Sequence, residues 1–178
     1  SYIIQKVHIF PLRAGSLTLD EAEVETVIHF KKEVSGSDSL QAVHFPATIR
    51  SIPRSIEVKS LPRLSSSNQS DMAVGRFNIT LRSDKKIYSP GELAEVNVTI
   101  SGKGNWPMIG DPSIQWPSSL QVMGPETTEK YDASTFPLKG EKTFLYKFIT
   151  TDTGIIKFPE ISFRYFDPES YDFREARS

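Results

Sequence analysis

Residues 142–150 read KTFLYKFIT, with an aromatic side chain at every second position from Phe144 to Phe148. Side chains of a β-strand point to opposite faces in turn, so this pattern predicts a strand with one buried face. The same period of two recurs along most of the chain, and helical periodicity is nearly absent. Gly, Pro, Asn, Asp and Ser separate most of the alternating runs, as in an all-β protein.

Alternation and turn residues together predict where the strands lie. The predicted strands are Tyr2–Phe10, Leu17–Leu19, Glu23–Phe30, Ile49–Lys59, Arg76–Arg82, Ala94–Ser101, Gln121–Met123, Lys142–Thr150, Ile155–Phe158, Ile161–Phe166 and Tyr171–Glu175. A short helix competes over residues 21–30, because Glu and Ala favour it. Val24, Thr26 and Ile28 nevertheless alternate as in a strand, which we favour. Residues 31–46 are expected to be a long loop.

A change of composition between Leu61 and Val74 marks a domain boundary. The sequence there reads LPRLSSSNQSDMAV, gathers Pro and Ser and loses its alternation, as linkers do. We expect residues 1–62 to be the C-terminal strands of a first immunoglobulin-like β-sandwich and residues 63–74 to be a linker. Residues 75–178 are expected to form a complete immunoglobulin-like β-sandwich domain. The predicted fold is therefore all-β, with tandem sandwiches of which the first is incomplete.

The alternation also names the inward faces of the second domain, whose rows should interdigitate between two sheets. These rows are Phe77, Ile79 and Leu81; Val96, Val98 and Ile100; Phe144, Tyr146 and Phe148; and Ile161, Phe163 and Tyr165.

A weak internal repeat suggests that the two segments are related. Residues 10–19 lie over residues 149–158, each with a strand, a turn at Gly15 or Gly154, and a second strand. Chance similarity among β-hairpins is the alternative. Residues 1–62 hold too few strands to close a core. We expect them to pack against the second domain or to pair with a second copy through exposed strand edges.

Composition and charge exclude several classes of function. The chain has 178 residues, 21 Lys and Arg against 22 Asp and Glu, and a net charge of −1, which disfavours nucleic-acid binding. The absence of Cys excludes thiol nucleophiles, thiolate metal sites and disulfides. His8, His29 and His44 match no metal-binding spacing, and exposed or hydrogen-bonded strand histidines are the simpler interpretation. The sequence predicts no catalytic residue, no cofactor and no metal.

An acidic turn near the C-terminus invites a second comparison with metal sites. Asp167, Glu169 and Asp172 surround Pro168. Calcium takes 6–8 oxygen ligands, more than this turn offers, so an ordinary hairpin turn is favoured.

The candidate binding residues lie in the loop Gly102–Trp116. Trp106, Met108, Ile109 and Trp116 are bulky and follow no strand alternation. Such side chains either tuck against the end of the sandwich or anchor a protein partner. These four residues are the candidate partner contacts. An extracellular carbohydrate-binding or adhesive sandwich, with tryptophan stacking on sugar rings, is the alternative function.

Several motifs, in order along most of the chain, resemble the BatD family of Bacteroides aerotolerance (oxygen-tolerance) proteins. The motifs are Ile56-Glu-Val58-Lys-Ser-Leu61-Pro62, Ala73-Val-Gly75-Arg-Phe77, Tyr88-Ser-Pro-Gly91-Glu92, Ser101-Gly-Lys-Gly104-Asn105, Gly140-Glu-Lys-Thr-Phe144-Leu-Tyr146, the Gly154 turn with Phe158-Pro159, and Phe163-Arg-Tyr165-Phe166-Asp167-Pro168. No feature of the family matches residues 31–46.

The resemblance implies a periplasmic protein of Gram-negative bacteria, anchored in the inner membrane by a helix outside these residues. It further implies tandem immunoglobulin-like domains and, as partners, other Bat membrane proteins with von Willebrand A-type and tetratricopeptide domains. The family supplies no catalytic residues to carry over. The expected function is therefore a non-enzymatic interaction or scaffold module connected with aerotolerance and envelope stress.

Overall fold

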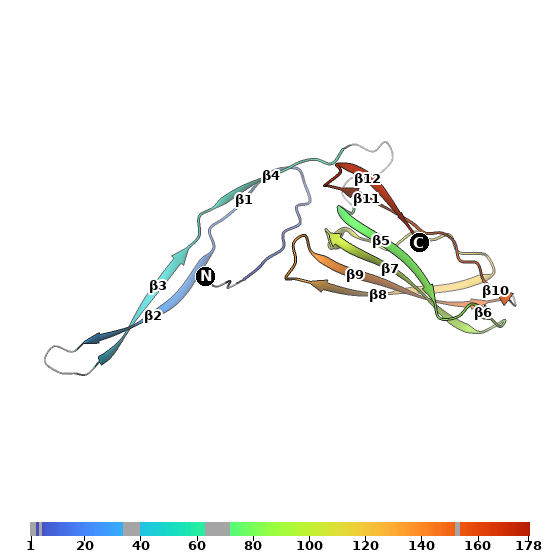
Figure 1. The fold of residues 1–178 in the computed structure, drawn as a ribbon, viewed down its shortest axis with the longest axis horizontal. Coiled ribbons are helices and arrows are strands. Elements are labelled where there is room, and N and C mark those ends of the chain that lie inside the picture. Colours follow the sequence, from blue (N-terminus) through green and yellow to red (C-terminus); the bar gives the residue numbers. More distant parts are fainter. Residues whose placement is uncertain (1–2, 4, 34–39, 63–71, 152–153) are drawn as a thin grey trace. The chain divides into compact units, whose positions relative to one another are not determined.

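The computed structural model describes residues 3, 5–33, 40–62, 72–151 and 154–178, and strands are the main regular structure among these residues (Figure 1). The described residues also include a short 3₁₀ turn, η2 (Trp106–Met108). Within the described chain there is no helix of sufficient length and hydrophobicity to cross a membrane. Two compact units are present: Pro11–Ser60, and Ser1–Phe10 together with Leu61–Ser178. Residues 1–10, expected with the first segment, thus group with the second.

The larger unit is built on a four-stranded antiparallel sheet in the order β5-β7-β9-β8. Its strands are β5 (Gly75–Ser83), β7 (Leu93–Gly104), β9 (Lys139–Thr150) and β8 (Leu120–Asp132). The predicted inward rows of β5, β7 and β9 do face one side of this sheet. Phe77, Ile79, Val96, Val98, Ile100, Phe144, Tyr146 and Phe148 are all buried in one core, with Leu81 packed at its margin. The alternation therefore predicted this face correctly.

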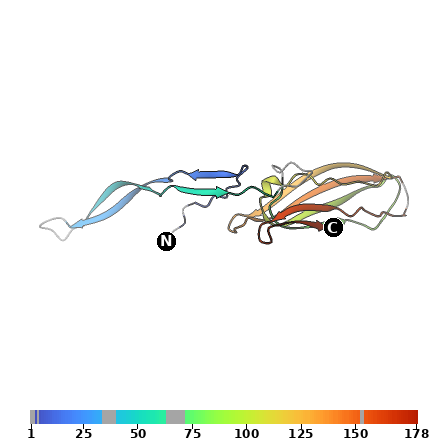
Figure 2. The same ribbon diagram turned by 90° about the horizontal axis from the view of Figure 1, so that it is seen from above.

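A hairpin of β11 (Ser162–Asp167) and β12 (Asp172–Arg177) packs against the sheet at its edge strand β5 (Figures 1 and 2). The ring of Phe77 in β5 meets Phe163 and Tyr165 edge to face, at centroid distances of 5.8 and 5.6 Å. A short pair of strands, β6 (Ile87–Tyr88) and β10 (Gly154–Ile155), lies beyond the main sheet. The arrangement is layered as in a β-sandwich.

The segment that leads into β5 is held in place by hydrogen bonds to Asn105, which we call the Asn105 clamp. The Asn105 side chain accepts a hydrogen bond from the Val74 amide (2.6 Å) and donates one to the Met72 carbonyl (3.2 Å). The backbone amide of Asn105 donates to the Val74 carbonyl (3.0 Å). On the other side, the Phe166 amide in β11 donates to the Ala73 carbonyl (2.9 Å). Residues 72–74 are thus bonded to both layers.

The smaller unit is a two-stranded antiparallel ribbon. Strand β1 (Gly15–Leu19) pairs with β4 (Arg54–Val58), and β2 (Glu23–Glu33) pairs with β3 (Leu40–Arg50). None of the side chains described between residues 11 and 60 is buried. The strand interpretation of residues 21–30 is confirmed from residue 23 onward.

Within residues 1–62, three of the predicted strands and loops are wrong. Of residues 2–10, those described form no strand, and the segment is held by side chains: Lys6 and His8 bond the carbonyls of Ser134 and Ala133, and Phe10 packs on the core. An alternating sequence predicts an extended segment that lies on an apolar surface. It does not require that the backbone of this segment pairs with a neighbouring strand.

The two other errors concern the ribbon. The expected loop of residues 31–46 is largely strand, because β2 continues to Glu33 and β3 starts at Leu40. The expected strand of residues 49–59 is broken, because residues 51–53 separate β3 from β4. Pro53, which has no amide hydrogen to donate, lies in this break. Most of the predicted linker, residues 63–71, lies outside the described residues.

Candidate interaction surfaces

Two of the four candidate contact residues lie inside the core. Trp106 is fully buried, and its indole Nε1 donates a hydrogen bond to the Leu138 carbonyl at 2.8 Å. Its ring packs edge to face on Phe77 at 5.4 Å. Ile109 is also buried, at 2% exposure. For these two residues the tucked alternative holds, and a surface contact in this conformation is excluded.

A glycine makes room for the Trp106 indole. A Cβ atom added to Gly140 on β9 would lie 3.1 Å from Cε2 of Trp106 and 2.5 Å from the Tyr131 ring. Sequence reasoning treated Trp106 as a loop residue without a strand partner. The surroundings that bury it, Phe77, the Leu138 carbonyl and the close Gly140, are all distant in the chain.

Met108 and Trp116 are half-buried and keep some surface. Met108 lines a hollow of about 520 Å³ between the loop residues 107–113 and residues 162–164 of β11. Trp116 packs on Tyr146 and Phe158, with centroid distances of 5.1 and 6.5 Å. Met108 and Trp116 therefore remain candidate contacts, whereas a sugar-stacking platform centred on Trp106 loses its surface.

The ribbon of β2 and β3 carries several exposed large apolar side chains. Alternate cross-strand pairs share a face, and one face holds the pairs Val24–Ile49, Thr26–Ala47, Ile28–Phe45 and Phe30–Val43. We call these eight residues the apolar ribbon face. It contains no charged residue. Phe45 and Ile49 are 61% and 60% exposed.

The opposite face of the same ribbon is mainly polar. Its pairs are Glu23–Arg50, Glu25–Thr48, Val27–Pro46 and His29–His44. Arg50 forms an ion pair with Glu23 at 3.1 Å. The ribbon is therefore amphipathic, and its apolar side is the one that requires a cover. Sequence alternation predicted this face in β2, but the expected loop hid the contribution of β3.

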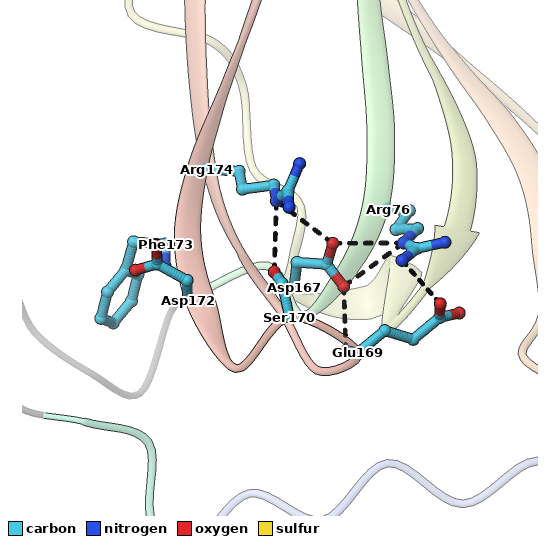
Figure 3. Close-up of polar contacts among 7 residues, drawn as sticks. All are labelled: Arg76, Asp167, Glu169, Ser170, Asp172, Phe173 and Arg174. Carbon is cyan, nitrogen blue, oxygen red and sulfur yellow. Dashed lines mark hydrogen bonds and ion pairs between the residues drawn. The ribbon is translucent and has the colours of Figure 1, made fainter.

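The acidic turn between β11 and β12 is a structural lock (Figure 3). The carboxylate of Asp167 is 2% exposed and forms ion pairs with Arg76 on β5 (3.2 Å) and Arg174 on β12 (3.3 Å). It also accepts a hydrogen bond from the Glu169 amide at 2.9 Å. Glu169 forms a further ion pair with Arg76 at 2.6 Å.

Electrostatics at this turn favour the charged carboxylate. Burial disfavours ionisation of Asp167, but hydrogen bonds from the Glu169 amide and the Arg76 side chain outweigh it and keep its pKa below the ordinary value of 3.8. The carboxylate is thus committed to holding the hairpin on the sheet. As the sequence predicted, these residues form a hairpin turn.

Among the residues that the structure describes, no three His, Asp or Glu side chains lie close enough together to hold a metal ion. Comparisons with protein-family models, with curated proteins and with solved structures gave no match. A functional proposal for this chain therefore rests on the surfaces described above, chiefly the apolar ribbon face.

Proposed function

We propose that this chain is a non-enzymatic protein-interaction module that binds a partner through the apolar ribbon face. The observation that carries the proposal is the exposure of that face. Phe45 and Ile49 lie more than half exposed on a surface without charge. Large contiguous apolar patches mark interaction sites, and an isolated two-stranded ribbon gains little stability by itself.

The second part of the proposal is that the chain comprises tandem immunoglobulin-like sandwiches, the first represented by its closing strands. Gly15 and Gly154 support it, because they have φ angles of 131° and 127° and begin β1 and β10. In each case a two-stranded hairpin follows, β2–β3 or β11–β12. The partner strands differ, since β1 pairs with β4 and β10 with β6.

The third part concerns location and partners, and rests on the resemblance to the BatD family. We propose a periplasmic module, anchored in the inner membrane through a segment outside these residues. Its partners would be Bat membrane proteins with von Willebrand A-type or tetratricopeptide domains, and its role would lie in aerotolerance and envelope stress. An uncharged apolar face suits a lasting contact of this kind, because its core would be desolvated on binding.

Site-specific photo-crosslinking in intact cells tests the proposal. A photoreactive phenylalanine analogue placed at Phe45 lies on the apolar ribbon face, and the same analogue at Thr48 lies on the polar face as the matched control. We expect adducts with a von Willebrand A-type or tetratricopeptide membrane protein from position 45 and none from position 48.

Other crosslinking results would contradict the proposal. Adducts of equal yield from both positions would mean that the apolar ribbon face is not a specific contact. An adduct only within the same chain, or only with a second copy, would show that the protein covers this face itself. Either result would remove the observation on which the partner proposal rests.

A further inference from the structure

The polar face of the ribbon brings together two histidines that are distant in sequence. His29 in β2 and His44 in β3 are direct cross-strand partners. Their rings stand at 87° to each other with centroids 4.6 Å apart, and the two Nδ1 atoms are 2.6 Å apart. A contact of this length requires one Nδ1 to donate its hydrogen and the other to offer its lone pair.

A pair of neutral imidazoles in this position is a chelating unit for a transition metal. Imidazole nitrogen binds Zn²⁺, Cu²⁺ and Ni²⁺ with metal–nitrogen distances of about 2.0–2.1 Å. Neighbouring ligands of a square-planar ion then lie about 2.8 Å apart, whereas two ligands of a tetrahedral ion lie about 3.3 Å apart. The observed 2.6 Å is shorter than either value, because a hydrogen bond that an ion would replace joins the two free rings. Small rotations of two exposed side chains would supply the difference.

We propose that His29 and His44 form a two-histidine binding site for a divalent transition-metal cation, Cu²⁺ above all, coordinated through both Nδ1 atoms. Cu²⁺ prefers tetragonal geometry and binds nitrogen ligands most strongly among the first-row divalent ions. The donor ring transfers its hydrogen from Nδ1 to Nε2, so that both Nδ1 lone pairs face the ion. Because both rings are exposed, water can fill the remaining coordination positions.

The surroundings of the pair limit its strength. The nearest positions on the same face are Val27, Pro46, Lys31 and Ala42, which add no carboxylate or imidazole ligand. The ammonium group of Lys31, two residues after His29, opposes a bound cation. The β2–β3 ladder holds the two histidine backbones in register, and this pre-organisation is the main favourable contribution of the protein.

Titration of the full chain with CuCl₂ tests the site, with location followed by NMR. Paramagnetic Cu²⁺ should first broaden the amide signals of residues 27–31 and 42–46. His29→Ala and His44→Ala should each weaken Cu²⁺ binding by at least about tenfold. Lys31→Ala should strengthen it, and Zn²⁺ should bind the unaltered chain more weakly than Cu²⁺.

His8 provides the matched control. It lies in the other compact unit, bonded to the Ala133 carbonyl at 3.0 Å. His8→Ala should leave the Cu²⁺ affinity unchanged. Broadening confined to the surroundings of His8, or affinity retained in both His29→Ala and His44→Ala, would overturn the proposal. The NMR signals report position in the unaltered protein, so the result does not depend on the variants folding.

Discussion

Two hairpins of this chain each carry apolar side chains on one face but lie in opposite environments. β11–β12 places Phe163 and Tyr165 against Phe77 of the four-stranded sheet, and Tyr165 is only 8% exposed. β2–β3 presents the apolar ribbon face, yet Phe45 on it is 61% exposed. The difference teaches that alternation specifies which side of a hairpin is apolar, whereas another element decides whether that side is buried.

The covered hairpin, β11–β12, is also attached to its sheet by an ion pair, and the described ion pairs of the ribbon include no such attachment. Asp167 connects its turn to Arg76 on the neighbouring sheet. The ion pairs of the ribbon that are described, from Arg50 to Glu21 and Glu23, remain within the ribbon itself. The two hairpins should therefore differ in opening, in stability and in their response to acid.

The largest expected difference is in hydrogen exchange. Amides of β7 and β9, at the centre of the sandwich sheet, should exchange at least about a thousandfold more slowly than amides of β2 and β3, equivalent to about 4 kcal/mol in opening free energy. Exchange of the isolated chain followed by NMR or mass spectrometry gives this ratio. Equal protection in the two units would mean that the ribbon is covered in the free protein.

Truncating the central contact of the covered hairpin should have a large effect on stability. Phe77→Ala removes a buried ring that touches Trp106, Phe163 and Tyr165. We expect the free energy of unfolding to fall by about 3–5 kcal/mol. Denaturant unfolding followed by tryptophan fluorescence measures it, because both tryptophans lie in the larger unit. A loss below about 1 kcal/mol would show that the hairpin is not packed there.

The acid response of the lock gives a smaller, pH-dependent difference. The pKa of Asp167 is lower in the folded chain than its ordinary value of 3.8, so the unfolded chain binds that proton first. Its contribution is present above about pH 4 and lost as the pH falls through the folded pKa. Asp167→Asn should lower stability at pH 7 and flatten the decline between pH 5 and pH 2. Parallel thermal melts of the two proteins would show whether the declines differ.

The smallest effect is expected in the uncovered hairpin. Phe45→Ala should change the free energy of unfolding of the sandwich unit by no more than about 0.5 kcal/mol, because the ring is 61% exposed and belongs to the other compact unit. The same fluorescence measurement applies. A loss above about 1.5 kcal/mol would indicate that the sandwich itself uses this ring.

The comparison also explains how far the sequence could be interpreted. The rows Val96–Ile100 and Phe144–Phe148 were predicted correctly, because period two alone fixes the faces of a strand once its sheet is buried on one side. The burial of Trp106 was left open, because it depends on contacts with residues far along the chain, namely Phe77 and the Leu138 carbonyl. The His29–His44 pair could not be derived either. Its register depends on a hairpin that the sequence suggested was a loop.

The Asn105 clamp has a mechanical consequence. Residues 72–74 lead the chain into β5 and are bonded to Asn105 on one side and to Phe166 on the other, so tension along the chain acts on these hydrogen bonds. Detaching that segment would break several short hydrogen bonds in two layers. These residues are thus suited to bear load, because a pulling force applied ahead of β5 would have to break hydrogen bonds to both layers before it detached the strand.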